Sequence, residues 1–268
     1  MTEILHPESS SALGSSSPQV TVSIVSHLQA ALVRELLDDL QRHCAASIEV
    51  IVTVNAPESV AFEGAQFRYP VIWVRNPAPK GFGANHNAAF RRARGNYFCV
   101  MNPDIRLQAD PFPPLVSALA DPGVAVAAPL VCNSDGAIED SARIFPTPGQ
   151  ILRKALSGRK SLDYVIGADP IEPDWVAGMF MLFRRETFAQ LGGFDERFHL
   201  YYEDVDLCAR ARLTGLRIAL DPRARVVHQA RRASHRQLRF AGWHARSMLR
   251  FFLSGPYRRL RQAGALRR

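Results

Sequence analysis

The sequence contains no aspartate or glutamate after Asp221, although thirteen arginines follow that residue. The chain of 268 residues has 33 lysines and arginines against 25 aspartates and glutamates, a formal net charge of +8. Residues 1–221 hold all 25 acids and only 20 basic residues, so the basic character belongs to the C-terminal fifth. Such a segment favours contact with phosphate groups, either of an anionic lipid surface or of a nucleic acid.

Long apolar runs and paired cysteines are also missing. A membrane-spanning helix needs about 18 to 20 apolar residues in succession, and no run approaches that length. Residues 1–18 are rich in serine and lack the apolar centre of a signal peptide, so we expect a flexible leader and a cytoplasmic protein. The four cysteines form no C-x-x-C pair, which argues against a disulfide framework and a structural zinc site. We expect them to be small buried side chains.

Short β-branched segments alternate with amphipathic ones through the first 104 residues. Strands are predicted at 20–25, 48–54, 71–74 and 97–101, and helices at 30–43 and 84–94. This alternation is typical of a parallel sheet with helices on both faces. The later elements are expected as a helix at 115–120, a strand at 124–128, an irregular stretch at 137–173, a strand at 175–183, a short helix ending at 191, a helix at 203–213 and a strand at 224–228.

Glycines, a lysine and three asparagines lie before and at the start of the helix predicted at 84–94, in the segment Asn76-Pro-Ala-Pro-Lys-Gly-Phe-Gly-Ala-Asn-His-Asn87. Free backbone N–H groups at a helix start favour an anion such as a diphosphate, and Lys80 adds a full charge. The third glycine of a G-x-G-x-x-G motif is missing, and an ordinary loop with a helix cap is the alternative. Because ligands bind beyond the carboxyl ends of parallel strands, this segment and Asn102-Pro-Asp104 are expected to meet in one crevice.

Carboxylates and a histidine mark three further places. Asp104 follows an apolar strand and offers an oxygen ligand to Mg²⁺ or Mn²⁺, unless it only begins the next turn. Glu203, Asp204 and Asp206 open a predicted helix. Acids are common at helix starts, but three in four positions repel one another unless a cation or hydrogen-bond donors share the space. His228 is either a packing or surface residue or, beside an aspartate metal site, a second ligand.

Together and in this order, these segments resemble the family 2 glycosyltransferases, most closely the bacterial rhamnosyltransferase-like branch. The matching stretches cover most of residues 20–235 and are Asn76–Asn87, Asn102–Asp104, Trp175–Arg185, Gly192–Phe198, Tyr202–Arg210 and His228. The resemblance implies an α/β protein of the GT-A fold, with a Rossmann-like mixed central sheet flanked by helices. We expect this domain over residues 19–232 and a basic amphipathic helical segment over residues 233–268.

The resemblance also implies roles for single residues in an inverting sugar transfer. Asp104 would bridge the donor diphosphate through Mg²⁺ or Mn²⁺, with His228 as a second metal contact. Asp204 would be the catalytic base with Glu203 beside it, and one base without an opposing nucleophile means inversion. The donor side is expected at Ser26, Asn55, Lys80, Gly81, Phe82, Asn87, Asn102 and Asp104, and the acceptor side at Trp175, Gly178 and Asp206.

Two positions depart from the family's pattern. Ser26-His27 and Val54-Asn55 stand where the family commonly has a Tyr-Asn and an Asp-Asn pair, and the missing aspartate usually contacts the pyrimidine base. The branch favours dTDP-rhamnose as the donor and an O-antigen-like surface polysaccharide as the product. The alternatives are a UDP-sugar-dependent enzyme of the same fold and a sugar-nucleotide-binding protein without transfer activity.

Apolar residues recur at helical spacing between Ser234 and Leu253, namely Leu238, Ala241, Ala245, Leu249 and Phe252, while Arg239, Trp243, Arg246 and Arg250 share another face. This pattern suits a helix lying on the inner face of the cell membrane, where a saccharide acceptor on a polyprenyl lipid would be met. A final helix packed on the domain is the alternative. We expect no nucleic-acid partner, because no recognition motif accompanies the basic segment and the body of the chain is acidic.

Overall fold

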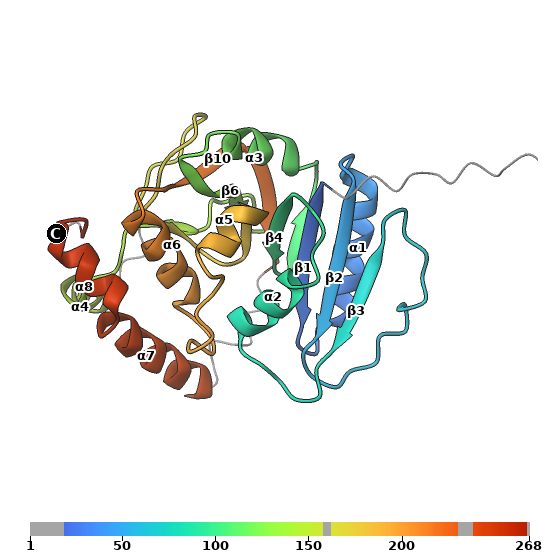
Figure 1. The fold of residues 1–268 in the computed structure, drawn as a ribbon, viewed down its shortest axis with the longest axis horizontal. Helices are drawn as coiled ribbons and strands as arrows, with labels where there is room; N and C mark the ends of the chain where they lie inside the picture. The colour runs from blue at the N-terminus through green and yellow to red at the C-terminus, as the bar shows by residue number, and fades with distance from the viewer. Residues whose placement is uncertain (1–18, 158–161, 230–237, 267–268) are drawn as a thin grey trace, which may run out of the picture.

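The computed structural model describes residues 19–157, 162–229 and 238–266. The expected leader at 1–18 and the expected boundary between 232 and 233 lie outside the described residues. The described chain forms one large mixed sheet with helices on both faces (Figure 1), which confirms the predicted fold class.

The sheet is parallel in one half and mixed in the other, with the strand order β3-β2-β1-β4-β9-β6-β10-β5. The parallel half consists of β1 (Val20–Ser26), β2 (Ile48–Val54), β3 (Val71–Arg75) and β4 (Tyr97–Met101). The mixed half consists of β5 (Ile105–Leu107), β6 (Val124–Cys132), β9 (Phe180–Arg184) and β10 (Arg217–His228). Strand order reverses between β1 and β4, so the crevice beyond their carboxyl ends is the expected ligand site.

Helices cover the two faces of the sheet and close two separate cores. Helices α1 (Ala30–His43) and α3 (Phe112–Leu119) lie on one face, and α2 (Phe82–Phe90), α5 (Arg185–Gln190) and α6 (Glu203–Leu213) lie on the other (Figure 1). Phe98 and Val100 of β4 belong to the core under α5 and α6, whereas Cys99 and Met101 belong to the core under α1. This alternation is what a strand buried on both faces requires. All four cysteines are buried and free, as expected.

Helix α2 begins and ends earlier than predicted, at Phe82 and Phe90 instead of 84 and 94. Its early end has a tertiary cause. The N–H of Arg94 donates to the Glu49 carboxylate and the N–H of Gly95 to the Thr21 hydroxyl, so side chains of β1 and β2 take the amides that a longer helix would need.

The strand predicted at 175–183 is two strands. β8 (Trp175–Val176) pairs with β7 (Ala142–Arg143) in a small second sheet, whereas β9 belongs to the central one. Between them, the N–H of Ala177 donates to the Ser141 carbonyl and extends the small ladder, whereas the N–H of Gly178 donates to Asp204 and belongs to neither sheet.

Other boundaries also differ from the prediction. The stretch expected to be irregular contains α4 (Pro148–Ser157), and α3 lies at 112–119 instead of 115–120. Strand β6 continues to Cys132, and β5 was not predicted. Strand β10 begins at Arg217 instead of 224. Buried Asp221 does not end the strand, because it is paired with Arg223 at 2.6 Å and the strand continues past it with a register shift.

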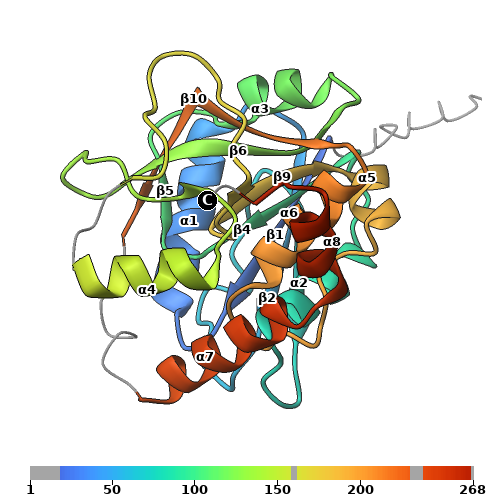
Figure 2. The same cartoon turned by 90° about the vertical axis from the view of Figure 1, so that its left-hand side faces the viewer.

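The C-terminal helices are α7 (Leu238–Phe252) and α8 (Gly255–Gln262), of which α8 was not predicted. They lie on the side of the molecule that faces the viewer in Figure 2. Ser247 and Phe251 of α7 are buried against the domain, whereas Ala241, Ala245 and Leu249 are exposed. Helix α7 is therefore packed on the domain, but of the apolar stripe that its sequence displays the structure places Phe252 against the core and leaves Ala241, Ala245 and Leu249 exposed. None of the helices in the described ranges combines the length and the apolar character needed to cross a membrane.

Candidate functional site

Two of the three residues between β8 and β9 bring the predicted site segments together. The carbonyl of Met179 accepts the N–H of Asn102, at the carboxyl end of β4, at 2.9 Å. The N–H of Gly178 donates to Oδ2 of Asp204 at 2.9 Å. A Cβ atom on Gly178 would lie 3.2 Å from the ring of Phe82, at the start of α2. Predicted donor-side, acceptor-side and catalytic residues therefore meet around one short connection.

The backbone immediately before α6 is held in a conformation that few residues adopt. Tyr201 and Tyr202 both have left-handed φ angles, of 70° and 67°. Their rings pack on His244 of α7, with centroid distances of 5.3 and 5.4 Å. Because α6 starts directly after this turn, α7 fixes the direction in which Glu203 and Asp204 leave the backbone.

The neighbouring carboxyl groups Glu203 and Asp204 differ in their surroundings. Burial raises the pKa of Glu203 well above its ordinary value, and the charge of Asp204 raises it further. Its Oε2 atom is buried without a hydrogen-bond partner. Burial also raises the pKa of Asp204, but the N–H groups of Gly178 and Val205 and the charge of Arg143 oppose the rise. The pair therefore keeps a proton on Glu203 and the negative charge on Asp204.

Asp104 and His228 lie together, as predicted for a metal site. Oδ2 of Asp104 is 3.2 Å from Nε2 of His228, and Oδ1 of Asp104 is buried without a partner. Nδ1 of His228 lies 2.8 Å from Oε2 of Glu139, a residue that sequence reasoning missed. Burial alone lowers the pKa of His228, but its contacts with the two carboxylates outweigh burial and raise the pKa to about 9.

This arrangement fits a divalent cation. Carboxylate oxygen suits Mg²⁺ and Mn²⁺, and one imidazole nitrogen beside it favours Mn²⁺ of the two. The unpartnered Oδ1 of Asp104 is an acceptor that a cation would satisfy. Within the described residues, no cluster of three or more His, Cys, Asp or Glu side chains is placed to hold a metal. The protein would thus supply two ligands, and phosphate oxygens and water would complete the shell.

Asparagine side chains shape the loop that carries Lys80. Oδ1 of Asn55 accepts the N–H of Lys80 at 2.8 Å, and its Nδ2 donates to the Lys80 carbonyl at 3.0 Å. Asn76 bridges Asn55 and Asn85 with two donated bonds of 2.9 and 2.7 Å. The backbone of Lys80 is therefore fixed while its side chain is exposed. Asn55, predicted to contact the donor, acts here as the support of this loop.

The start of α2 is occupied in part by the protein itself. The N–H of Phe82 donates to the His199 carbonyl at 2.9 Å, and a Cβ atom on Gly81 would lie 2.7 Å from the same oxygen. The glycine thus permits a close approach of two loops. The predicted contact between a diphosphate and this helix start stays a prediction. It concerns Lys80 and the backbone N–H groups of the first turn of α2 other than that of Phe82.

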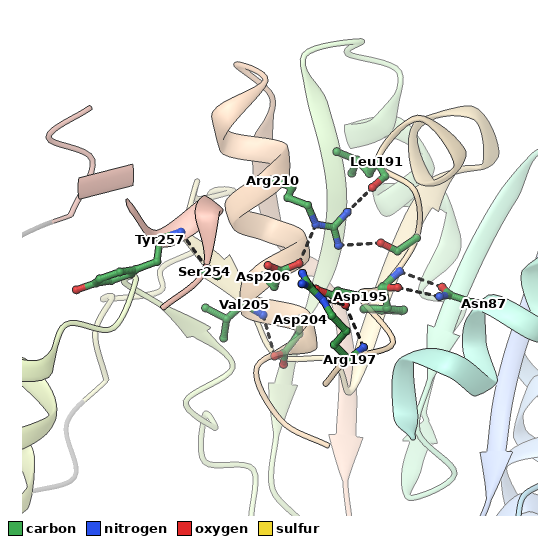
Figure 3. A network of polar contacts seen from close by, with 12 residues as sticks. Asn87, Leu191, Asp195, Arg197, Asp204, Val205, Asp206, Arg210, Ser254 and Tyr257 are labelled. Carbon is green, nitrogen blue, oxygen red and sulfur yellow. Dashed lines mark hydrogen bonds and ion pairs between the residues drawn. The ribbon is translucent and has the colours of Figure 1, made fainter. Parts of the chain in front are cut away.

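Asn87 and Asp206 both hold the turn Gly192-Gly193 (Figure 3). The Asn87 amide donates to the Phe194 carbonyl at 2.8 Å and accepts the Phe194 N–H at 2.9 Å. Asp206 pairs with Arg210 at 2.8 Å, and that guanidinium donates to the Gly193 carbonyl at 2.8 Å. Their side chains are engaged in scaffolding, and donor contact by Asn87 and acceptor contact by Asp206 remain predictions.

Glu58, which the sequence analysis did not identify, lies beside the positions that depart from the family pattern. Glu58 accepts a hydrogen bond from the Ser26 hydroxyl and another, of 2.9 Å, from the N–H of Ala30 at the start of α1. A carboxylate thus stands at the carboxyl ends of β1 and β2, although Val54 replaces the family's aspartate.

On the predicted acceptor side, Trp175 is anchored by its indole N–H, which donates to the Ile144 carbonyl at 2.9 Å. The guanidinium of Arg143 lies over its ring at 5.4 Å from the centroid. Arg143 therefore adds a cation near Asp204 that the sequence alone did not single out.

Comparison with known proteins shows the family of this chain. The model of Glycosyl transferase family 2 matches residues 21–192. Rhamnosyltransferase WbbL of Escherichia coli is 27% identical over 245 residues, which cover 87% of this chain and 92% of WbbL. N-acetylglucosaminyl-diphospho-decaprenol L-rhamnosyltransferase of Mycobacterium tuberculosis is 32% identical over 143 residues, which cover 50% of this chain and 47% of the relative.

Solved structures share the fold. The mannosyltransferase PcManGT from Pyrobaculum calidifontis, in complex with GDP-Man and Mn²⁺, has a TM-score of 0.63 at 21% identity over 94% of this chain and 70% of its own. GalNAc-T7 with UDP, GalNAc and Mn²⁺ has the same TM-score at 17% identity over 81% of this chain and 45% of its own. At these identities the likeness concerns the fold alone. The family match covers well over half of this chain, which therefore belongs to glycosyl transferase family 2, in its rhamnosyltransferase-like branch.

Proposed function

We propose that this glycosyltransferase moves L-rhamnose, with inversion, from dTDP-rhamnose to a saccharide on a lipid-linked acceptor during assembly of a surface polysaccharide. The names of the relatives support the sugar, and the mycobacterial relative's name describes an acceptor with a diphospho-polyprenyl carrier. The observation that carries the proposal is the Asp204 carboxylate, held by two backbone N–H groups beside buried Glu203, whose pKa burial raises.

Asp204 has the state that a general base needs. An acceptor hydroxyl is a weak nucleophile until its proton leaves, and a positioned carboxylate supplies a typical 10²- to 10⁴-fold acceleration. Oδ2 of Asp204 adjoins Gly178, whose missing side chain permits the close approach of the Phe82 ring and the Asp204 carboxylate. With one ionised carboxylate acting on the acceptor, the hydroxyl attacks the anomeric carbon directly, and the configuration inverts.

The departing nucleotide diphosphate is proposed to meet positive charge from two sources. Asp104 and His228 would hold Mn²⁺ or Mg²⁺, which neutralises phosphate charge when bound. Lys80 presents its exposed ammonium group from a loop whose backbone is fixed by Asn55. Glu139 would keep the His228 ring in place through its contact with Nδ1.

Exposed leucines support an acceptor at a membrane surface. Leu249 of α7 and Leu253 just after it are 59% and 69% exposed, and Leu152 and Leu156 of α4 are 61% and 80% exposed. Figures 1 and 2 agree in placing α4 and α7 on the same side of the molecule. Apolar side chains and arginines on one side suit a peripheral protein on the inner face of the cell membrane.

The Asp204→Asn variant tests the proposal. We expect transfer from dTDP-rhamnose to fall at least about 10²-fold while donor binding stays measurable, because the amide cannot take the acceptor proton. Asp38→Asn removes an exposed carboxylate from α1, on the other face of the sheet, and should transfer sugar like the wild type. Unchanged turnover in Asp204→Asn would show that the base is another residue.

Donor identity needs a separate experiment, because structures of this fold bind different nucleotides. Thermal unfolding with dTDP-rhamnose, UDP-sugars and GDP-mannose, each with and without Mn²⁺, would identify the donor by the stabilisation that any ligand of the native state confers. The largest metal-dependent shift should come from dTDP-rhamnose. A larger shift with a UDP-sugar would favour the UDP-sugar-dependent alternative, and stabilisation without any transfer or donor hydrolysis would favour a binding protein.

A further inference from the structure

A cavity of about 340 Å³ lies between α7 and the loop at 197–199, outside the residues assigned so far to donor or base. It is lined by Arg197, His199, Trp243, Arg246, Ser247 and Arg250. One water molecule occupies about 30 Å³ in the liquid, so the cavity has room for a group the size of a diphosphate.

Three arginines line the cavity, and within the described residues only Arg197 of the three has an ion pair. Arg197 is paired with Asp195 at 2.6 Å. Arg246 and Arg250 lie one helical turn apart on α7, and the acids of the chain end at Asp221, so α7 contains no carboxylate that could pair with them. Two guanidinium groups on one wall can bind phosphate oxygens through paired N–H donors.

The opposite wall of the cavity belongs to the loop that leads into the candidate active site. The His199 ring packs on Trp243 with a centroid distance of 4.7 Å, and the His199 carbonyl holds the start of α2. The Ser247 hydroxyl donates to the Leu200 carbonyl at 2.8 Å. Three residues further on, the chain reaches Glu203 and Asp204, so an occupant of this cavity would lie against the segment that positions the base.

The surroundings point to a lipid as the source of the phosphate. Helix α4, which carries the exposed Leu152 and Leu156, lies on the same side of the molecule as α7, which carries Arg246, Arg250 and the exposed Leu249 (Figure 2). A tryptophan beside arginines at such a surface is typical of contact with the headgroup region.

We propose that the cavity binds the phosphate of a membrane lipid, and that during catalysis this phosphate is the diphosphate of the lipid-linked acceptor. The assignment of this phosphate to the lipid-linked acceptor rests on the proposed function. The binding would bring the acceptor to the enzyme by its carrier, independently of the sugar that reacts at Asp204.

Vesicle sedimentation of the full chain tests this proposal. The vesicles are neutral phosphatidylcholine alone, the same lipid with phosphatidylglycerol, and the same lipid with a polyprenyl diphosphate. We compare the wild type with Arg246→Ala/Arg250→Ala and with Arg258→Ala/Arg261→Ala, a control that removes the same charge from exposed positions of α8. The conservative pair Arg246→Lys/Arg250→Lys should recover part of the binding, and thermal unfolding checks that each variant is folded.

We expect the cavity variant to bind polyprenyl diphosphate vesicles at least about tenfold more weakly than the control variant, since each lost charge-assisted bond weakens binding by about that factor. If the cavity variant lost binding to phosphatidylglycerol vesicles alone, the cavity would still be a phosphate site, but its ligand would be the headgroup of the bulk lipid. Equal losses in both variants, or none in either, would overturn the proposal. A wild type that binds these vesicles but no nucleotide sugar would contradict the proposed function while leaving the cavity site standing.

Discussion

The backbone N–H of Gly178 donates a 2.9 Å hydrogen bond to Oδ2 of Asp204, and the N–H of Val205 donates one of 2.8 Å to Oδ1. Both bonds favour the charged carboxylate. Glu203, adjacent in the chain, has a buried Oε2 without a partner. Two backbone N–H donors therefore favour the charged form of Asp204, whereas burial and the charge of Asp204 raise the pKa of Glu203 against the backbone N–H groups that oppose the rise.

Glu203→Gln is expected to preserve transfer to within about tenfold, because a neutral amide resembles the protonated acid; Asp204→Asn should lose far more. The native state holds the Glu203 proton more tightly than the unfolded chain, so this group costs stability as the pH rises from about 4.3 towards the raised native pKa. The glutamine variant lacks that cost. Urea unfolding at pH 5 and pH 8 should show its stability gain over the wild type growing with pH. A Glu203→Gln enzyme as inactive as Asp204→Asn would mean that Glu203 is the ionised partner.

Glu139→Gln is expected to weaken Mn²⁺ binding about 10- to 100-fold, the usual effect of removing a carboxylate that orients a ligating histidine. The reason is the 2.8 Å contact between Glu139 and Nδ1 of His228. Titration calorimetry with Mn²⁺ alone measures this without turnover. Glu172→Gln, which removes an exposed carboxylate paired with Arg217, is the matched control. Equal Mn²⁺ affinities in the two variants would exclude Glu139 from the metal site.

The residues that the sequence identified and those it missed differ in the range of their contacts. The buried strands β1, β2 and β4 and the helices α1 and α6 were predicted almost to the residue, because their apolar periodicity is a local property. Glu139 contacts His228 across 89 positions of sequence. No local pattern predicts such a pair, since the pairing arises only when the sheet places β10 beside the end of β6.

Helix ends were the least predictable part of the fold for a related reason. The early end of α2 depends on the side chains of Glu49 and Thr21, which come from strands far away in sequence. The packed face of α7 follows from Ser247 and Phe251, although its apolar stripe suggests another orientation. In each case a tertiary contact overrides the local signal.

Asn87→Ala is expected to destabilise the fold by about 2 to 4 kcal/mol, because it leaves the buried N–H and carbonyl of Phe194 without partners. The turn Gly192-Gly193 should loosen first, since Asn87 is its contact with α2. Chemical unfolding measures the loss, and proteolysis near residue 193 reports the turn. Asn96→Ala, at an exposed asparagine just before β4, should change stability little. A small effect at both positions would mean that the turn is held chiefly by Arg210.

His86 should make the protein sensitive to mild acid. Its ring lies beneath the site, with Nδ1 2.8 Å from the Ser23 hydroxyl, Nε2 buried without a partner and Phe82 packed at 4.5 Å. Burial lowers the pKa of His86 to about 3. In the unfolded chain His86 binds a proton near pH 6.5, whereas in the native chain it stays neutral down to about pH 3. The contribution of His86 to the unfolding free energy is therefore fully present above pH 6.5 and is lost as the pH drops towards 3.

The size of this effect follows from linkage. Between pH 7.5 and pH 5, His86 alone should remove about 2 kcal/mol of unfolding free energy. His86→Gln keeps a hydrogen-bonding side chain but cannot titrate, so its unfolding free energy should fall by about 2 kcal/mol less than that of the wild type over the same interval. Nitrogen NMR of the imidazole gives an independent reading, in which the native His86 ring stays neutral at pH 5. Parallel pH profiles for the two proteins, together with a ring that protonates in the native state near pH 6, would show that solvent reaches Nε2 and that the histidine beneath the active site is not sealed from water.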